Sequence, residues 1–294
     1  MSSYCGYVAL VGRPNVGKST LLNHILRQKV AITSRKPQTT RHNLLGIDSE
    51  GDHQALYIDT PGIHDATGKT LNQLMVNAAR SVLDDVDLRI MLVEAKRWTE
   101  EDEFVLKLLA RSPRPTVAVI SKVDTVSDKN ELLPQIQQLS ELGCFEHIVP
   151  LSALRNDGVE PLRQLVFSYL PEQVHLYEAD DVTDRPTRYL VSEIIREKLM
   201  RQLGDEIPHS IAVTIESFRE EGDLTTIHAN IFVERDGQKR IVIGKQGQRL
   251  KQIGQDARKD IETLLQQKVM LHLWVKVRKG WTNNAGLLRR LGYE

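Results

Sequence analysis

The amino-acid sequence predicts an α/β domain, an open sheet with helices on both faces, followed by a small α+β domain. Between residues 7 and 170, short apolar runs alternate with segments of helical period, which is typical of parallel strands joined by crossover helices. Residues 171–186 are acidic, bounded by prolines and without a clear period. From residue 187 the pattern becomes helix, two strands, helices and a final strand. We therefore predict domains at 1–170 and 187–294, the second with a short C-terminal tail, joined by a linker at 171–186.

The strands of the first domain are predicted from short apolar or alternating runs. They fall at 7–11, 44–48, 54–59, 88–94, 116–121 and 147–151. Helices between them are indicated by apolar residues three and four positions apart, such as those at 21–26 and 104–109. In the second domain, a helix is expected around 191–203, strands at 211–215, 227–233 and 269–277, and a basic helical region around 253–265.

Composition and charge narrow the class of protein. A chain of 294 residues with 40% hydrophobic and 27% charged residues is typical of folded domains. This composition argues against a disordered chain and against an integral membrane protein. Its 39 basic and 39 acidic residues cancel, but residues 1–182 carry a net charge of −5 and residues 183–294 a net charge of +5. Between residues 235 and 290 there are 14 basic and 4 acidic residues. This basic stretch is either a solvated face or a nucleic-acid surface.

Cysteine usage and hydropathy point to the cytoplasm. Cys5 and Cys144 lie far apart and belong to no metal-binding pattern, so neither a disulfide framework nor a zinc site is expected. No leader-like segment and no apolar run of about 18 residues is found, so we expect no transmembrane segment. Any membrane contact would be peripheral.

A phosphate-binding loop follows the first predicted strand and precedes a helix. It matches GxxxxGK[ST], whose backbone N–H groups, together with the helix N-terminus, bind phosphates. The predicted nucleotide contacts here are Gly12, Arg13, Pro14, Asn15, Val16, Gly17, Lys18, Ser19 and Thr20. Lys18 is expected to reach the β- and γ-phosphates, and Ser19 to offer its hydroxyl to Mg²⁺.

A second motif, DTPG, ends the predicted strand 54–59. Asp59 would hold Mg²⁺ through a water molecule, and the N–H of Gly62 would contact the γ-phosphate. The neighbouring Thr39 and Thr40 each offer a hydroxyl to the metal, and we favour Thr40. The predicted nucleotide contacts of this motif are Asp59, Thr60, Pro61, Gly62 and Ile63.

Two further segments are expected to recognise the base. The carboxylate of Asp124 can accept both guanine N1–H and the N2 amino group, which favours GTP over ATP. Lys122 can lay its apolar stem along the base, and the N–H of Ala153 is a candidate donor to guanine O6. The predicted contacts are Ser121, Lys122, Val123, Asp124, Ser152, Ala153 and Leu154.

The second domain contains a GxxG element before its basic helical region. This context resembles a type II KH domain, in which such a loop clamps the backbone of about four unpaired nucleotides. The candidate RNA-binding residues are Ile243, Gly244, Lys245, Gln246, Gly247, Arg249, Lys251, Arg258 and Lys259. Trp274 and Trp281 are candidates for stacking on bases, although Trp274 could instead cover a helix.

Taken in order, GRPNVGKST, PQTTRHN, DTPG and the C-terminal domain resemble the Era family of translation-factor-related GTPases over essentially the whole chain. The resemblance implies binding of GTP/GDP and Mg²⁺ and slow GTP hydrolysis involving Lys18, Thr40 and Gly62. It also implies recognition of 16S rRNA near its 3′ end and a role in 16S rRNA processing and 30S ribosomal subunit biogenesis. We expect a cytoplasmic monomer, with peripheral association at the inner face of the inner membrane.

Three positions bear on the mechanism. Ser121 replaces the family asparagine, so we expect weaker nucleotide binding with guanine preference retained. Ile63 occupies the position of the water-orienting glutamine of Ras-like enzymes, and we assign no other residue to that role. Asn15 matches an asparagine of potassium-stimulated GTPases, which makes it a candidate K⁺ site.

Two alternatives stay open from the sequence. One is an RNA-binding scaffold whose nucleotide is structural, and the other is a related tRNA-modifying GTPase, which the ending RRLGYE disfavours.

Overall fold

The computed structural model describes residues 2–36, 39–63, 70–204, 211–284, 286 and 288. It divides into two compact units. The first comprises Met1–Ala31, Thr40–Thr67 and Asn72–Asp184. The second comprises Ile32–Thr39, Gly68–Leu71 and Arg185–Glu294.

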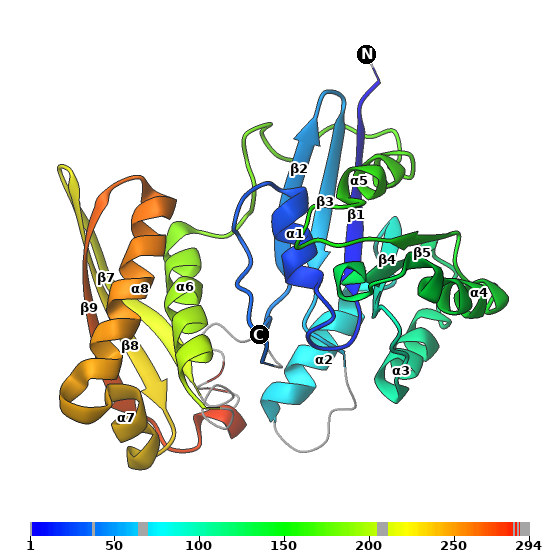
Figure 1. The fold of residues 1–294 in the computed structure, drawn as a ribbon. Helices are drawn as coiled ribbons and strands as arrows, with labels where there is room; N and C mark the ends of the chain where they lie inside the picture. The colour runs from blue at the N-terminus through cyan, green and yellow to red at the C-terminus, as the bar shows by residue number, and fades with distance from the viewer. Residues whose placement is uncertain are drawn as a thin grey trace. The chain divides into compact units, whose positions relative to one another are not determined.

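The first unit is built on a six-stranded sheet (Figure 1). Its strands are β1 (Tyr4–Val11), β2 (Leu44–Glu50), β3 (His53–Asp59), β4 (Leu88–Glu94), β5 (Thr116–Ser121) and β6 (His147–Pro150). Its helices are α1 (Lys18–Ile25), α2 (Thr70–Val82), α3 (Glu100–Leu109), α4 (Leu133–Glu141) and α5 (Val159–Phe167). Short 3₁₀ turns lie at Val123–Thr125 and Lys129–Leu132. The α/β class predicted from the sequence is confirmed.

The strand order is β2-β3-β1-β4-β5-β6. All neighbouring pairs are parallel except β2 and β3, which are antiparallel. The parallel pairing that the sequence pattern favoured is therefore wrong for β2 and β3 alone among the described strands of this sheet. Its cause is the two-residue connection Gly51–Asp52, which closes a hairpin with Gly51 at a φ of 61°.

Helices cover both faces of this sheet. On one face, α2, α3 and α4 pack on apolar side chains of β1, β4 and β5. On the other, α1 and α5 contact each other and β3 (Figure 1). The central strands are buried on both sides, which explains why they are almost continuously apolar in sequence. This arrangement brings the carboxyl ends of β1, β3, β4 and β5 to the same edge.

Residues 171–183, which we predict to lie in the linker, run along the first unit. The amide oxygen of Gln54 accepts from the N–H groups of Leu176 and Tyr177 at 2.8 and 3.1 Å. Further along, Ile47 N donates to the carbonyl of Val182 at 3.0 Å, and Thr183 Oγ1 donates to Leu45 at 2.7 Å. The outer edge of β2 is therefore hydrogen-bonded to this segment.

The second unit has the order helix, strand, strand, helix, helix, strand, as predicted. It contains α6 (Thr187–Gln202), β7 (Ala212–Glu221), β8 (Leu224–Val233), α7 (Asp236–Ile243), α8 (Gln248–Leu265) and β9 (Lys268–Val277). The sheet order is β7-β8-β9, with β7 and β8 antiparallel and β8 and β9 parallel. Helices α6 and α8 contact each other and the sheet. Apolar side chains from both helices and all three strands form one core.

No helix in the described part of the chain has the length and apolar character needed to span a bilayer.

Candidate functional site

The phosphate-binding loop joins β1 to α1, which is the strand-loop-helix context that the motif requires. Gly12 and Gly17 have φ values of 148° and 110°, and Asn15 has a φ of 63°. A Cβ atom at Gly12 would lie 2.7 Å from the carbonyl oxygen of Leu92. Both the positive φ and the lack of space therefore require glycine at this position.

Lys18 folds back over the loop. Its ammonium group donates to the carbonyl oxygens of Gly12 at 2.9 Å and Arg13 at 3.0 Å, and the side chain is buried. Burial lowers the pKa of Lys18 to about 8, although the carboxylate of Asp59 opposes this shift. A buried cation at the start of a helix, held here by two carbonyl oxygens, is well suited to binding an anion.

Three oxygen ligands meet beside this lysine. Ser19 Oγ donates to Asp59 Oδ2 at 2.6 Å and lies 2.9 Å from Thr40 Oγ1, which is 3.2 Å from the same carboxylate. Asp59 is fully buried, its pKa is raised by burial, and its Oδ1 has no hydrogen-bond partner among the described residues. Two hydroxyls and a buried carboxylate match the oxygen donors that Mg²⁺ prefers, so these residues fit this ion. Of the two threonines considered, Thr40 is the one in this cluster.

The residues after Asp59 pack tightly against the phosphate loop. A Cβ atom at Gly62 would lie 2.7 Å from the backbone of Pro14. Ile63 donates its N–H to the Gly12 carbonyl at 3.2 Å, and its side chain is fully buried in the core. Ile63 is therefore a packing residue in this structure.

The two base-recognition segments meet at Asp124. Ser152 Oγ donates to Asp124 Oδ1 at 2.5 Å, and the N–H of Val123 donates to the Leu151 carbonyl at 3.3 Å. The structure thus brings these segments together, while Leu154 is 74% exposed. A carboxylate held by one hydroxyl keeps acceptor capacity for the two guanine donors.

Ser121 links base recognition to the phosphate loop. Its hydroxyl is 2.7 Å from the carbonyl oxygen of Val16 and 3.0 Å from that of Val93, and the residue is buried. The longer amide of an asparagine at this position could both brace the loop and donate to the base. In this chain the hydroxyl is bonded to two backbone carbonyl oxygens, one of them in the phosphate-binding loop. This geometry supports a role in bracing the loop and gives no support to a contact with the base.

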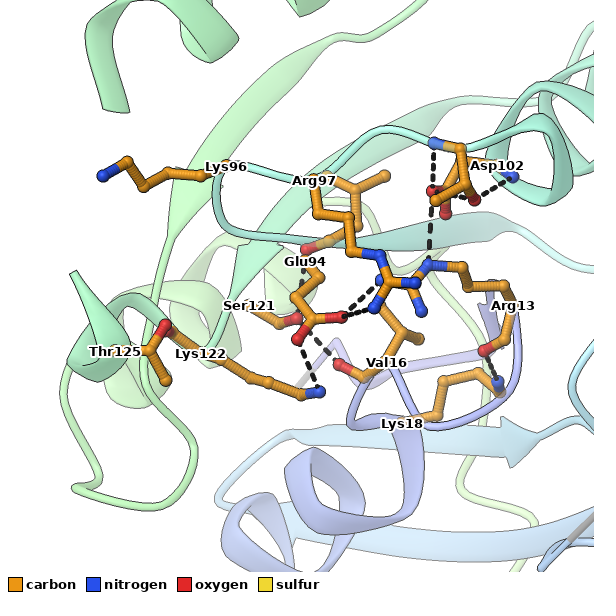
Figure 2. Close-up of polar contacts among 12 residues, drawn as sticks. Arg13, Val16, Lys18, Glu94, Lys96, Arg97, Asp102, Ser121, Lys122 and Thr125 are labelled. Atoms are coloured by element: carbon orange, nitrogen blue, oxygen red, sulfur yellow. Dashed lines mark hydrogen bonds and ion pairs between the residues drawn. The ribbon is translucent and has the colours of Figure 1, made fainter. Parts of the chain in front are cut away.

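Glu94, at the end of β4, was not anticipated from the sequence. Figure 2 shows its carboxylate between Arg13 and Lys122, with Oε2 accepting from Arg13 Nη2 and Oε1 from Lys122 Nζ at 3.0 Å. Burial alone would raise the pKa of Glu94, but these hydrogen bonds outweigh it and lower the pKa. Arg13 Nε also donates to the buried Asp102 at 3.3 Å. Glu94 thus connects the phosphate loop to the base-recognition lysine through hydrogen bonds. In the sequence, the one signal for such a role is that an acidic residue ends a buried strand, as Asp59 does.

The GxxG element forms the turn between α7 and α8. Gly244 and Gly247 have φ values of 73° and 78°, with a 3₁₀ turn at Lys245–Gly247. A Cβ atom at Gly244 would lie 2.7 Å from the Cβ atom of Arg249. This leaves a turn without side chains at its two glycines, which permits close approach of a sugar-phosphate backbone.

The predicted RNA-binding cations differ in their surroundings. Arg249 Nη1 donates to the Ile241 carbonyl at 2.8 Å, and Arg258 pairs with Glu262 at 2.9 Å. In contrast, Lys245, Lys251 and Lys259 are exposed, and no ion pair connects them to another described residue. These three lysines are the better candidates for phosphate contacts.

Trp274 and Trp281 differ in their exposure to solvent. Trp281 is fully buried, so this candidate for stacking on bases is not accessible to them in this structure. Trp274 is 42% exposed and stacks on His228 with ring centroids 5.1 Å apart, so it does not cover a helix of the described chain.

The sheet order and these contacts define the class as a P-loop GTPase joined to a KH domain. Two family models agree: "50S ribosome-binding GTPase" matches residues 7–122, and "KH domain" matches residues 206–282. GTPase Era of Ectopseudomonas mendocina (strain ymp) is 55% identical over 99% of this chain and 97% of its own length. GTPase Era of Azotobacter vinelandii (strain DJ / ATCC BAA-1303) is 53% identical over 99% of this chain and 97% of its own length. The chain belongs to the Era family of GTPases, and it is a GTPase.

Two solved structures resemble the whole chain. One is the crystal structure of Era in complex with MgGDPNP and nucleotides 1506–1542 of 16S ribosomal RNA, with 38% identity, 99% coverage of both chains and a TM-score of 0.96. The other is an Aquifex aeolicus Era variant bound to GDP and AlF₄⁻, with 38% identity, 99% coverage of both chains and a TM-score of 0.95.

Proposed function

We propose that this chain is a Mg²⁺-dependent GTPase that binds 16S rRNA near its 3′ end and acts in 16S rRNA processing and 30S subunit biogenesis. The proposed binding of GTP and Mg²⁺ rests on one observation, the cluster of side-chain oxygens of Ser19, Thr40 and Asp59 beside the buried Lys18. Whole-chain similarity to Era proteins, one of them bound to MgGDPNP and a 16S rRNA segment, supports the same assignment.

The chain's own residues would share the work of hydrolysis. When bound, Mg²⁺ supplies positive charge that offsets the charge on the phosphates. Ser19, Thr40 and Asp59 would hold that ion, and Lys18 would exchange its two carbonyl contacts for phosphate oxygens. Asp124 would select guanine through its carboxylate, and Glu94 would keep Lys122 aligned beside the base. The buried Ile63 leaves the attacking water to be oriented by other groups.

We assign nucleotide binding to residues 1–170 and RNA binding to residues 187–294, with 171–186 between them. The assignment of RNA binding is supported by the turn at Gly244–Gly247, whose two glycines carry no side chains, and by the exposed Lys245, Lys251 and Lys259. The backbone N–H groups and lysines there would bind phosphates of unpaired nucleotides.

Asn15 supports a proposed K⁺ site beside the phosphates. It is exposed at the tip of the phosphate loop, with a φ of 63°. We expect turnover to be faster in K⁺ than in Na⁺ at equal ionic strength, and the difference to disappear in Asn15→Ala. Equal rates of the wild type in the two salts would refute the K⁺ site.

The proposed function is tested by crosslinking the purified protein to ribosomal RNA with a GTP analogue or with GDP and mapping the contacts. We expect crosslinks near the 3′ end of 16S rRNA and stronger binding in one nucleotide state. Multiple-turnover phosphate release separates a GTPase from a scaffold with structural nucleotide. Crosslinks elsewhere would refute the RNA assignment, and equal RNA affinity in both states would show simple tethering.

The family resemblance also supports a cytoplasmic monomer with peripheral contact at the inner membrane. Sedimentation of the purified protein and fractionation of cells test these two points.

A further inference from the structure

Strand β9 has two faces of different chemistry. One face lies in or packs against the core of the second unit, with Val269, Leu271, Leu273, Val275 and Val277. Successive side chains of a strand point to opposite faces of the sheet. The other face therefore carries Lys268, Met270, His272, Trp274 and Lys276. Helices α6, α7 and α8 all contribute to the core, so none of these three helices covers the other face (Figure 1).

Three aromatic rings gather on this outer face. His228 of β8 lies directly opposite His272 of β9, with ring centroids 4.8 Å apart. Trp274 stacks on His228 at 5.1 Å with an interplanar angle of 12°, and on His272 at 5.8 Å with an angle of 29°. None of the three residues is buried, and the Trp274 side chain is 42% exposed. We call these three residues the aromatic cluster, and its nearly parallel rings can accept a further flat ring.

Lysines lie on either side of the aromatic cluster along β9. Lys268 and Lys276 are exposed on the same face of the strand. No ion pair connects Lys268 to another residue in the described part of this unit. Lys276 Nζ lies 3.7 Å from a carboxylate oxygen of Glu216, and both side chains are about half exposed, so this pair holds the lysine weakly. Both lysines are therefore available to an anion that approaches from solvent.

Rings between accessible cations are the combination that binds single-stranded nucleic acid, because bases stack on the rings and phosphates contact the cations. A stable protein interface needs a broader apolar centre. Among the described residues of this sheet, only Leu224, Met270 and Trp274 are large, apolar and exposed. Cross-strand ring contacts also stabilise a sheet, but this role requires no cations at both ends of the cluster. Unpaired RNA is thus the partner that this face fits best.

The aromatic cluster lies within reach of an RNA strand held at the GxxG turn. A Cβ atom at Gly254 of α8 would lie 3.4 Å from Leu273 Cδ1, so Leu273 packs against this part of the helix. Gly254 is seven residues after Gly247, which corresponds to about 10 Å along the helix axis. Trp274 follows Leu273 and points to the other side of β9. Because β9 is an edge strand of the described sheet, an RNA strand that leaves the turn can pass around it.

We propose that His228, His272 and Trp274 form a second RNA-binding surface, on which unpaired bases stack beyond the nucleotides clamped at the GxxG turn. Lys268 and Lys276 bind the neighbouring phosphates. The stacking tolerates different sequences, since every base has a π-face. This inference rests on the proposed RNA binding by residues 187–294.

The test compares the full-length wild type with Trp274→Leu, which keeps an apolar side chain on β9 but removes the ring. The matched control is Met270→Ala, which removes an exposed apolar side chain from the same face without removing a ring. The probe is a fluorescently labelled unpaired RNA with the sequence of the 3′ end of 16S rRNA. A second set of probes carries one abasic nucleotide at each position in turn. Affinity is measured by fluorescence anisotropy at several salt concentrations, and folding is checked by circular dichroism.

For Trp274→Leu we expect RNA affinity to fall about tenfold, which is within the range for the loss of one stacked base. The slope of log affinity against log salt should stay unchanged, because no phosphate contact is removed. Met270→Ala should stay within about twofold of the wild type, since the rings remain. One abasic position should weaken binding to the wild type and have no further effect in Trp274→Leu, because the ring and the base it stacks on act as a pair.

Two additional measurements keep the test decisive if Trp274→Leu folds poorly. Trp274→Phe should retain most of the affinity, since phenylalanine keeps a stacking face. Photocrosslinking of the wild type to the same RNA containing 5-iodouridine should label the β9 peptide that contains His272 and Trp274.

Wild-type affinity of Trp274→Leu, or an equal loss in Met270→Ala, would overturn the inference, and so would crosslinks confined to the GxxG turn and α8. RNA binding that depends on Lys245 but not on Trp274 would leave the proposed function standing without this second surface. Failure of the wild type to bind the RNA would instead overturn the proposed RNA binding itself.

Discussion

The carboxylate of Glu94 connects the phosphate loop with the base-recognition segment, and removing its charge should weaken both. In Glu94→Gln, Arg13 and Lys122 lose an ionised partner. A hydrogen bond to a charged group contributes roughly 1.5–3 kcal/mol, and a glutamine oxygen replaces about 1 kcal/mol of one such bond. Because Asp102 still pairs with Arg13 and the Glu94 side chain is 22% exposed, we expect a net loss of about 2 kcal/mol at pH 7.

The pH dependence gives this prediction a defined sign. The pKa of Glu94 is lowered from its ordinary value of 4.5, because its hydrogen bonds outweigh burial. Such a group stabilises the fold above pH 4.5, and this contribution is lost as pH falls through the lowered pKa. The difference in unfolding free energy between wild type and Glu94→Gln should therefore be full above about pH 5 and shrink below it.

Urea unfolding followed by circular dichroism at a series of pH values measures this difference. Labelling of the Cys5 thiol at pH 7 identifies the transition of the first unit, since Cys5 is fully buried in β1. The control is Glu101→Gln, an exposed glutamate on α3. A loss below about 0.5 kcal/mol, or a difference that grows as the pH falls below 4.5, would refute the assigned role of Glu94.

Three further predictions concern single contacts. Ser121→Ala should lower nucleotide affinity and cost about 1–3 kcal/mol of stability, because the buried Val16 carbonyl loses its donor, and unchanged urea midpoints and nucleotide titrations would contradict this. Asp124→Asn should lose affinity for GTP and gain affinity for xanthosine triphosphate, whereas unchanged GTP preference in competitive titration would rule out Asp124 as the base-reading group. Lys245→Ala should weaken rRNA binding and reduce the slope of log affinity against log salt by about 1, and an unchanged slope would remove this lysine from the phosphate contacts.

Local spacing in the sequence predicts which candidate site residues follow a strand, and the fold places them there. The phosphate loop, Asp59 and Asp124 each occupy a fixed position after a strand, so the parallel sheet brings them to one edge. The antiparallel β2 was missed although Gly51–Asp52 is a hairpin-type turn, because a short alternating run does not reveal strand direction.

Contacts between distant positions could not be predicted in this way. Thr33 and Glu197 are 164 positions apart, and nothing local to either residue indicates the other. Ser121 shows the same limit, because nothing local to it indicates that its hydroxyl lies 2.7 Å from the carbonyl oxygen of Val16. The burial of Trp281 likewise depends on packing outside its own segment.

The hydrogen bonding of residues 171–183 to the outer edge of β2 also has a consequence for synthesis of the protein. Strand β2 forms the outer edge of the sheet, and its partner on that side includes the Val182 carbonyl, about 135 residues later. At 5–20 residues per second, a ribosome needs on the order of ten seconds to make that stretch. During this time the nascent chain carries an open sheet edge that can pair with another strand, so truncation before residue 182 should promote aggregation of the growing domain.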